Sequence, residues 1–382
     1  MIIASVVGAR PQFIKLAPLW KETKHQSGIK HIIIHSGQHY DYKMSKLFFD
    51  ELDIPSPDYN LKVGSGTHAY QTGEIMKRCE PVFSKIKPDW IFVYGDTNTT
   101  VAAALCAAKM HIPIAHIEAG LRSYNTLMPE EINRIITDHC SKILFCPTKT
   151  SLKNLKKEGF SNIHNFSEEL PAKLASTHQD TTDFSIAIQV GDIMYDSLLM
   201  GISVAEKKST ILNKLKVQPH DYFLATFHRA KNTDNPVPLR NIMSALSQLD
   251  KTIIFPIHPR TKKRLKEFSI SSGENIRFTE PASYLDMLIL QKNAQKVITD
   301  SGGIQKEAFL LGTPCVTTRN ETEWEETLTS RHNILAGTNP EKIVDAIMEK
   351  VSISLKSTES YQPFGDGRAA YKIIRSLQLL TK

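Results

Sequence analysis

Apolar segments of strand length alternate with helical stretches along most of the chain. In the first half, apolar runs occupy residues 2–8, 31–37, 89–95, 112–118 and 142–148. Helical stretches follow them, beginning with a helix from Pro11 and continuing at 41–52, 99–110, 129–140 and 151–159. Because these runs are apolar without alternation, they are typical of strands buried on both faces. The pattern therefore predicts βα units and a parallel sheet.

The pattern breaks at 161–187, a polar stretch that we interpret as an interdomain linker or insertion. A second αβ series follows, with strands at 222–228, 252–258, 275–280, 296–300 and 314–318. A chain of 382 residues is long for one core, which favours two domains. We expect an α/β protein with two doubly wound, Rossmann-like domains, residues 1–170 and residues 171–364.

Composition excludes few classes of protein. The net charge of +7 tolerates an anionic ligand, and the lysine-rich segments 153–157 and 262–266 are typical of solvated helix faces. A basic nucleic-acid binder lacks the expected interleaving of aromatic and basic residues. No apolar run reaches the roughly 18 residues of a membrane span, and no secretory signal is recognisable. The 5 cysteines lack zinc spacing, so we expect reduced thiols, no metal site and a cytoplasmic location.

Candidate chemistry lies where strands end, which is where doubly wound sheets bind ligands. Arg10, in Gly-Ala-Arg-Pro-Gln (8–12), precedes a helix and suits a phosphate, although a tight turn with an exposed arginine explains it equally well. Asp96 follows the strand at 89–95. It is a candidate catalytic carboxylate or a helix N-cap, a role for which Thr97 and Asn98 compete.

Glu118 ends an apolar strand, where a charge is unfavourable unless it is paired or functional. Arg122 is its expected structural partner. Glu130 and Glu131 begin a helix, and the spacing of Glu130, Arg134 and Asp138 allows i, i+4 ion pairs of a few tenths of a kcal/mol. The charged residues of this helix, 130–138, thus have a complete structural explanation, whereas Glu118 does not.

The second half offers a turn that suits a diphosphate. Ser301, Gly302 and Gly303 join a strand to a helix, where free amides and the helix dipole attract anions. Glu307, on the second turn, would reach a ribose. His228 ends another strand, and a catalytic role and a packing role explain it equally well. His258 also ends a strand, but no neighbouring motif supports a catalytic role for it. Together with the carboxylates, this cradle predicts acid–base chemistry on a nucleotide-linked substrate.

The order of these motifs resembles the non-hydrolysing UDP-N-acetylglucosamine 2-epimerases, over nearly the whole chain. The matching motifs are Gly-Ala-Arg-Pro (8–11) with Lys15, Gln38-His39, Gly95-Asp96-Thr97, His116-Ile-Glu118-Ala-Gly-Leu-Arg122, Pro129-Glu-Glu-Ile-Asn-Arg134, His228-Arg229, Asp300-Ser-Gly-Gly-Ile-Gln-Lys-Glu307 and Phe-Gly-Asp-Gly (364–367).

The resemblance implies a fold of the glycosyltransferase-B type, with the site in the cleft and a final helix, 365–382, returning to the first domain. It implies inversion at carbon 2 of a UDP-linked N-acetylated sugar, through departure and re-addition of UDP, for cell-surface polysaccharide synthesis. No cofactor is implied, and a homodimer is expected. The implied catalytic residues are Asp96, Glu118, Glu130 and His228, and the implied UDP-binding residues are Arg10, Lys15, Ser301, Gly302, Gly303 and Glu307.

Departures from the more familiar bacterial pattern point to a subgroup. Trp324 stands where those members have a substrate-contacting arginine, and Gln12 where they have a glutamate. With Ser-Tyr-Asn (123–125), these changes are similar to enzymes acting on UDP-2,3-diacetamido-2,3-dideoxy-glucuronate in O-antigen assembly. The activating second UDP-N-acetylglucosamine site matches at Gln38 but not at Asp41. A hydrolysing 2-epimerase and a glycosyltransferase remain alternatives.

Overall fold

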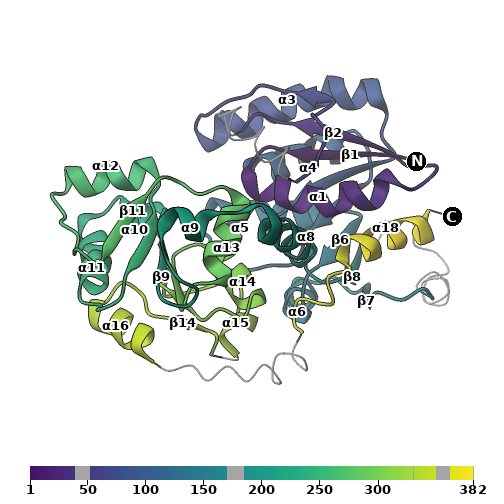
Figure 1. Cartoon of the computed structure of the whole chain (residues 1–382). Coiled ribbons are helices and arrows are strands. Elements are labelled where there is room, and N and C mark those ends of the chain that lie inside the picture. Colours follow the sequence, from purple (N-terminus) through teal and green to yellow (C-terminus); the bar gives the residue numbers. More distant parts are fainter. Residues whose placement is uncertain (39–51, 170–184, 330, 350–361, 382) are drawn as a thin grey trace. The chain divides into compact units, whose positions relative to one another are not determined.

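The computed structural model describes residues 1–38, 52–169, 185–329, 331–349 and 362–381 (Figure 1). The chain forms two compact units, one made of residues 1–200 with 362–382 and the other of residues 201–361. Each unit is built on its own parallel sheet.

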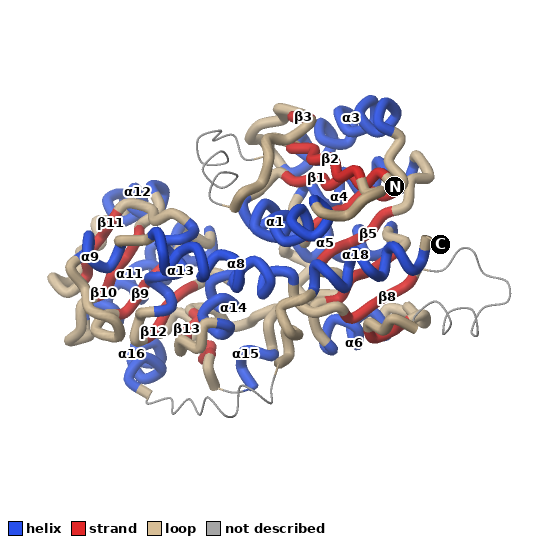
Figure 2. The backbone as a smooth tube through the Cα atoms, turned by 45° about the vertical axis from the view of Figure 1, so that its right-hand side comes forward, coloured by secondary structure: helices blue, strands red, loops and turns tan. Residues whose placement is uncertain are grey.

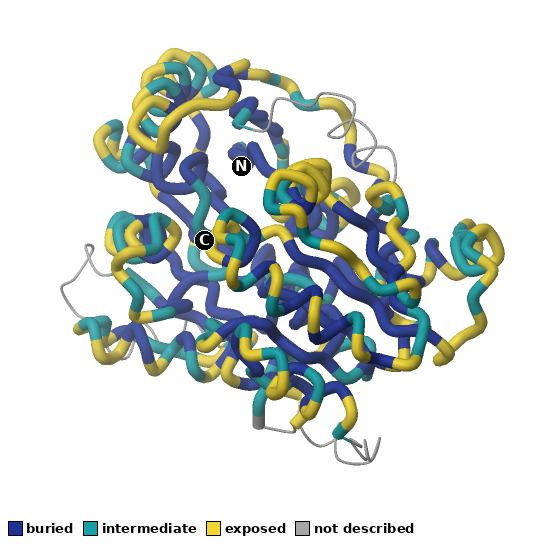
Figure 3. Tube along the Cα trace, turned by 90° about the vertical axis from the view of Figure 1, so that its left-hand side faces the viewer, coloured by how far each residue is buried: buried dark blue, intermediate teal, exposed yellow. Residues whose placement is uncertain are grey.

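The first unit contains an 8-stranded sheet in the order β3-β2-β1-β4-β5-β6-β8-β7. All of its strand pairs within the described residues are parallel. The strands are β1 (Ile2–Val7), β2 (Lys30–His35), β3 (Tyr59–Asn60), β4 (Trp90–Tyr94), β5 (Ile114–Ile117), β6 (Ile143–Cys146), β7 (Ile163–Asn165) and β8 (Ile186–Gln189). The central strands β1, β4, β5 and β6 are almost wholly buried, as their uninterrupted apolar sequences predict (Figure 3).

Helices flank this sheet (Figure 2). They are α1 (Arg10–Lys24), α3 (His68–Ile86), α4 (Asn98–Lys109), α5 (Pro129–Cys140), α6 (Lys149–Lys157) and α18 (Ala369–Leu380). Helices α3, α4 and α5 pack in succession, and α18 packs against α1. The start of α18 is fixed because the carboxylate of Asp196 accepts hydrogen bonds from the backbone N–H groups of Ala369 and Ala370, at 3.1 and 2.8 Å. The last helix therefore belongs to the first unit.

The second unit contains a 6-stranded parallel sheet in the order β11-β10-β9-β12-β13-β14. Its strands are β9 (Phe223–Thr226), β10 (Ile253–Pro256), β11 (Ile276–Thr279), β12 (Lys296–Thr299), β13 (Cys315–Thr317) and β14 (Asn333–Leu335). Its helices are α9 (Ile211–Leu215), α10 (Ala230–Thr233), α11 (Pro236–Ser247), α12 (Pro259–Glu267), α13 (Tyr284–Lys292), α14 (Gly302–Leu310), α15 (Glu326–Thr329) and α16 (Pro340–Met348), while α8 (Ile193–Lys208) begins in the first unit and ends in the second.

Both sheets reverse their strand order in the middle. In the first, β1 lies beside β4, and in the second, β9 lies beside β12. Strand order reverses at these two pairs, and this is where open parallel sheets bind ligands beyond the carboxyl ends of their strands. Arg10 and Asp96 follow β1 and β4, and His228 and Ser301 follow β9 and β12. The candidate residues thus lie at the switch points of the two sheets.

The domain boundary predicted at residue 170 differs from the structure. The first unit extends to Met200, because β8 pairs with β6 and β7 in the first sheet. The interpretation of 161–187 as a linker is therefore wrong at both ends, where β7 and the start of β8 lie. Residues 170–184 between them fall outside the described part, as does most of the predicted helix 41–52.

Candidate active site

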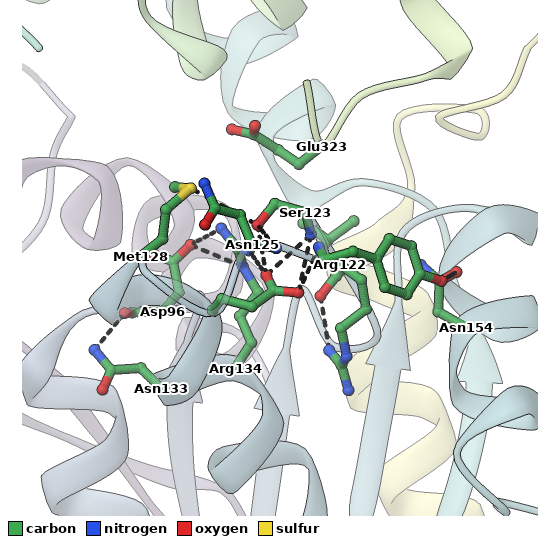
Figure 4. A network of polar contacts seen from close by, with 12 residues as sticks. Asp96, Arg122, Ser123, Asn125, Met128, Asn133, Arg134, Asn154 and Glu323 are labelled. Atoms are coloured by element: carbon green, nitrogen blue, oxygen red, sulfur yellow. Dashed lines mark hydrogen bonds and ion pairs between the residues drawn. The ribbon is translucent and has the colours of Figure 1, made fainter. Parts of the chain in front are cut away.

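Asp96 lies directly after β4 and is held by residues of α5. Arg134 donates to Oδ2 of Asp96 from Nε and Nη2, at 3.1 and 2.8 Å. Asn133 donates to the backbone carbonyl of Asp96 at 2.9 Å (Figure 4). Thr97, rather than Asp96, caps helix α4 by accepting from the N–H of Thr100. The capping explanation of Asp96 is therefore wrong, and its carboxylate is clamped through one oxygen.

Glu118 pairs with a lysine that is distant in sequence. The ammonium Nζ of Lys15, on α1, lies 2.5 Å from Oε2 of Glu118, and the two side chains are only 6% and 9% exposed. The contact is an ion pair without hydrogen-bond geometry at that oxygen. Glu118 also has a φ of +73°, which is unusual for a residue with a side chain and costs about 1–3 kcal/mol. The fold thus accepts local strain at this carboxylate.

The expected pairing of Glu118 with Arg122 is wrong, because Arg122 points to other carboxylates. Its Nη2 lies 2.8 Å from Asp138, and its Nε lies 2.6 Å from Glu158. Burial disfavours the charged form of Asp138, but the adjacent His116 and Arg122 outweigh burial and lower the pKa of Asp138. Arg122 is therefore a buried structural cation, and the ion-pair partner of Glu118 is Lys15.

The two glutamates that open α5 have different environments. Glu130 is exposed, whereas Glu131 is 1% exposed. The carboxylate of Glu131 accepts from the backbone N–H groups of Ser123 and Tyr124, at 2.9 and 2.8 Å, and pairs with Arg134. Glu131 therefore shapes the loop before α5 and supports the arginine that holds Asp96. This leaves Glu130 as the glutamate that is free to face a ligand in solvent.

Arg10 is the first residue of α1 and is half-buried. The turn before it is tight: a Cβ on Gly8 would lie 1.9 Å from Oγ of Ser36. Gln12 fixes this turn, because its Oε1 accepts from the N–H groups of Gly8 and Ala9, at 2.8 and 3.1 Å. The amide end of Gln12 donates to the carbonyl of Tyr94 at 3.1 Å. The phosphate-suited turn after β1 is thereby tied to the end of β4.

In the second unit, Asp300 anchors the segment that carries His228. The buried carboxylate of Asp300 accepts from the backbone N–H groups of His228 and Arg229, both at 3.1 Å. The ring Nδ1 of His228 lies 3.5 Å from Oδ1 of Asp300, and its side chain is 53% exposed. His228 is therefore oriented from behind and open to solvent. His258, in contrast, caps α12.

Ser301, Gly302 and Gly303 form the start of α14. Ser301 is the N-cap and accepts from the N–H of Ile304 at 3.4 Å, and the two glycines are the first helical residues. A Cβ on Gly303 would meet nothing closer than 3.9 Å, so this side of the turn is open. The arrangement presents backbone N–H groups at a helix N-terminus, which suits a phosphate.

A carboxylate stands beside this turn. Oε1 of Glu323 would lie 2.3 Å from a Cβ on Gly302. Glu323 pairs with Arg319 at 2.9 Å and with Arg229 at 3.7 Å. Burial opposes ionisation of Glu323, but the two arginines outweigh burial and lower its pKa to about 2. The turn is therefore surrounded by a charged cluster that contains two cations.

Glu307, a predicted residue of α14, and its neighbour Lys306 are turned into the core. Glu307 is 5% exposed and accepts from Nε2 of Gln291 at 2.7 Å. Lys306 is fully buried, and its ammonium lies 3.7 Å from the ring centroid of Trp324, which is 3% exposed. The ring of Trp324 thus packs against the ammonium of Lys306 in the same unit. Glu307 has a structural partner, Gln291, in addition to its predicted role in binding a ribose.

Some residues that build the site were missed in the sequence. Asp300 follows a buried strand, as Glu118 does, and this shared signal was available. His116 and Asp138 were not singled out as site residues, because each lies in an ordinary strand or helix pattern and they meet only in three dimensions. Within the described ranges, no group of three or more His, Cys, Asp or Glu side chains is arranged to hold a metal ion, and no helix could span a membrane.

These observations define a class of protein. Two parallel α/β sheets carry acidic and basic side chains at their switch points, with carboxylates in the first unit and a phosphate-suited turn with a histidine in the second. The chain belongs to the UDP-N-acetylglucosamine 2-epimerase family, whose model matches residues 21–378.

Relatives match over the full length of the chain. A UDP-N-acetylglucosamine 2-epimerase homolog of Methanococcus maripaludis is 48% identical, covering 100% of both chains. A UDP-2,3-diacetamido-2,3-dideoxy-D-glucuronate 2-epimerase of Pseudomonas aeruginosa is 42% identical, again covering 100% of both. The crystal structure of Methanocaldococcus jannaschii UDP-GlcNAc 2-epimerase in complex with UDP-GlcNAc and UDP is 41% identical, with a TM-score of 0.85 and 99% coverage of each chain.

The comparisons confirm the predicted family, the predicted α/β fold with two parallel sheets, and the prediction of an isomerase of this type. The roles of the individual site residues stay predictions.

Proposed function

We propose that the chain inverts carbon 2 of a UDP-linked N-acetylated sugar, of the UDP-GlcNAc to UDP-ManNAc type, by elimination and re-addition of UDP. The observation that carries the proposal is the buried pair of Lys15 and Glu118 at the end of β5, in a chain of this family. A carboxylate held at a strained, nearly buried position is suited to proton transfer rather than to surface pairing.

The chemistry requires carboxylates because the proton on carbon 2 has no adjacent carbonyl to acidify it. The bond from carbon 1 to the UDP oxygen breaks first, the oxygen keeps the electron pair, and a cation-like centre develops at carbon 1. Carbon 2 then loses its proton to a carboxylate, which leaves a carbon–carbon double bond. A proton returns to the opposite face of carbon 2, and UDP adds again at carbon 1.

We assign the proton transfers to carboxylates of the first unit. Two faces of carbon 2 need two proton-handling groups, and Asp96, Glu118 and Glu130 are the candidates. Arg134 holds one oxygen of Asp96 and Lys15 holds Glu118, so both carboxylates are oriented before substrate arrives. Such preorganisation lowers the reorganisation that the reaction requires.

We assign the UDP group to the second unit, and we assign a phosphate-binding role to Arg10, as the family resemblance implies. The α14 turn of Ser301–Gly303 offers N–H groups to the diphosphate, and His228 offers a ring nitrogen to the leaving oxygen. Glu307 is assigned to the ribose, as the family resemblance implies, in exchange for its present bond to Gln291. No step in this scheme uses a metal or a nicotinamide.

One observation favours a second substrate. The Pseudomonas aeruginosa relative, 42% identical, is named for UDP-2,3-diacetamido-2,3-dideoxy-D-glucuronate. In this chain Trp324 is buried against Lys306, so residue 324 offers no exposed cation to a sugar. The same reaction on that diacetamido sugar, in O-antigen or related polysaccharide synthesis, is therefore the second candidate. A homodimer in the cytoplasm is part of the proposal.

The test is incubation of the purified chain with each UDP-sugar in deuterated water, followed by NMR of the products. Epimerised sugar still linked to UDP, with deuterium at carbon 2 alone, is expected. Free sugar with released UDP would identify a hydrolysing enzyme, and no change without an acceptor would favour a glycosyltransferase. Epimerised product that keeps hydrogen at carbon 2 would contradict elimination and re-addition.

A further inference from the structure

A buried histidine links the two strand ends that carry the carboxylates of the first unit. His116 lies in β5, and its side chain is 0% exposed. Its Nε2 lies 2.8 Å from the backbone carbonyl of Gly95, and its Nδ1 lies 2.6 Å from Oδ1 of Asp138. Both ring nitrogens are therefore occupied by oxygen partners, and no solvent reaches them.

The chemistry of these partners restricts the protons on the ring. The carbonyl of Gly95 has no proton to give, so Nε2 must donate to it. Asp138 is also an acceptor when it is ionised, and then Nδ1 must donate as well. A neutral imidazole has one donor and one acceptor. A neutral His116 would therefore fit only if Asp138 were protonated and donated its proton to Nδ1.

The surroundings of Asp138 favour its carboxylate form. Its Oδ2 accepts from the N–H of Gly120 at 3.1 Å and lies 2.8 Å from the guanidinium of Arg122. Arg122 also pairs with Glu158, which is partly exposed, so charges of alternating sign lead from Asp138 towards the surface. The thiol of Cys146 also interacts with Asp138, and burial raises the pKa of this thiol well above the usual value, which keeps it neutral.

We propose that His116 is an imidazolium whose two N–H groups position Asp96 and Glu118 for the proposed epimerisation. The Nε2–H group holds the carbonyl of Gly95, the residue immediately before Asp96. The Nδ1–H group holds Asp138, which in turn holds the N–H of Gly120, two residues after Glu118. His116 thus holds the backbone just before Asp96 directly, and it holds the backbone just after Glu118 through Asp138.

The backbone near these contacts is left-handed, a conformation that is strained only at Glu118, because glycine adopts it readily. Gly95, Glu118 and Gly120 have φ values of +62°, +73° and +78°. A left-handed conformation at a residue with a side chain persists only where the surroundings enforce it. Hydrogen bonds to charged groups are stronger than those between neutral groups, so they are suited to holding such a residue in place. His116 is thus a positioning residue, because it acts through the backbone of the two carboxylates and touches no reacting atom.

The charge can be measured without substrate. In chain labelled with ¹⁵N at histidine, both ring nitrogens of His116 are expected to carry a proton, because each one faces an oxygen that only accepts. His31 is the internal control: its ring nitrogens lie 2.8 and 2.7 Å from the hydroxyls of Thr23 and Ser5, and burial lowers its pKa to about 4. It should be neutral in the same spectrum. An unprotonated Nδ1 at His116 would overturn the proposal, whether or not the enzyme turns over.

The kinetic arm rests on the proposed function and uses His116→Gln with His31→Gln as the matched control. His116→Gln should lower kcat by roughly 10- to 100-fold, the effect of a small misplacement of reacting groups, and leave the affinity for UDP unchanged. His31→Gln should leave both unchanged. An unaltered kcat in folded His116→Gln would overturn the positioning role. If wild type turns over no UDP-sugar, the proposed function fails instead, and the spectrum still decides the charge of His116.

Discussion

The ammonium of Lys15 lies 2.5 Å from Oε2 of Glu118, and neither side chain is more than 9% exposed. Lys15 comes from the second turn of α1, which follows β1, and Glu118 comes from the end of β5. The pair therefore joins elements on the two sides of the switch point between β1 and β4. A buried pair of this kind is a weak contributor to stability but is strongly destabilising when one partner is removed.

Glu118→Gln should separate the catalytic from the structural reading of this pair. The substitution keeps the shape of the side chain and removes its ability to accept a proton. Turnover should fall by about 100-fold or more, with little change in UDP affinity, because a proton-handling group acts mainly in the transition state. Near-normal turnover would mean that Glu118 is structural.

Lys15→Met provides the complementary measurement. Alone it leaves the Glu118 carboxylate buried and unpaired, at an expected loss of about 3–5 kcal/mol in the free energy of unfolding. Combined with Glu118→Gln, it should lose much less than the sum of the single changes. Lys24→Met is the control, because Lys24 is 49% exposed and lies 4.0 Å from Asp53. Additive losses in urea unfolding would show that the pair is not coupled.

Gln12 is required as an amide by its neighbours. Its nitrogen donates to the carbonyl of Tyr94, which has no proton to return. Gln12→Glu would place a carboxylate oxygen against that carbonyl, in a side chain that is 1% exposed. We expect a loss of about 2–4 kcal/mol in the free energy of unfolding above neutral pH. Gln248→Glu, at an exposed helix end, should change stability by less than about 0.5 kcal/mol.

The sequence predicted the buried strands well, because a strand covered on both faces reads as an apolar run. It failed at β7 and β8, where the strands are only 3 and 4 residues long and stand at the two ends of a polar stretch. They belong to the first sheet because β8 pairs with β6 and β7 pairs with β8, which no local pattern encodes. The domain boundary was misplaced for the same reason.

The site was predictable where a single residue broke a local rule. Glu118 did so by ending an apolar strand with a charge. The partners of Glu118 and Asp96 were not predictable from spacing, because Lys15 and Arg134 reach them across the sheet from other helices. Helical spacing even favoured wrong partners, since it paired Asp138 with Arg134 while the fold pairs Asp138 with His116 and Arg122.

Asp196 should make stability depend on pH. Burial raises the pKa of Asp196 to about 6, against the hydrogen bonds from Ala369 and Ala370, which lower it. The folded state therefore binds this proton more tightly than the unfolded chain does. The stabilisation is complete below the ordinary pKa of about 3.9 and is lost as pH rises to about 6, by on the order of 2–3 kcal/mol.

Urea unfolding measured from about pH 4 to about pH 7 should therefore show a decline that Asp196→Asn removes. Asp366→Asn is the contrasting control. A hydrogen bond and ion pair with Lys372 outweigh burial and lower the pKa of Asp366, so its contribution has the opposite sign. A decline that persists unchanged in Asp196→Asn would assign it to another group.

Trp324→Arg tests what the replacement of the familiar arginine means in this chain. The ammonium of Lys306 lies 3.7 Å from the Trp324 ring centroid, and both side chains are buried. A guanidinium at residue 324 would bring two cations together in the core and would replace the cation–π attraction with repulsion. We expect a loss of at least about 3 kcal/mol in the stability of the second unit, measured by amide exchange in β12 and β13.

Combining Trp324→Arg with Lys306→Glu should recover part of this loss, because the two charges are then opposite. Trp324→Phe keeps a ring over the ammonium and serves as the control, with a loss smaller than that of Trp324→Arg. If Trp324→Arg alone is as stable as wild type, the ring and the ammonium are not coupled, and residue 324 is free to vary with the sugar.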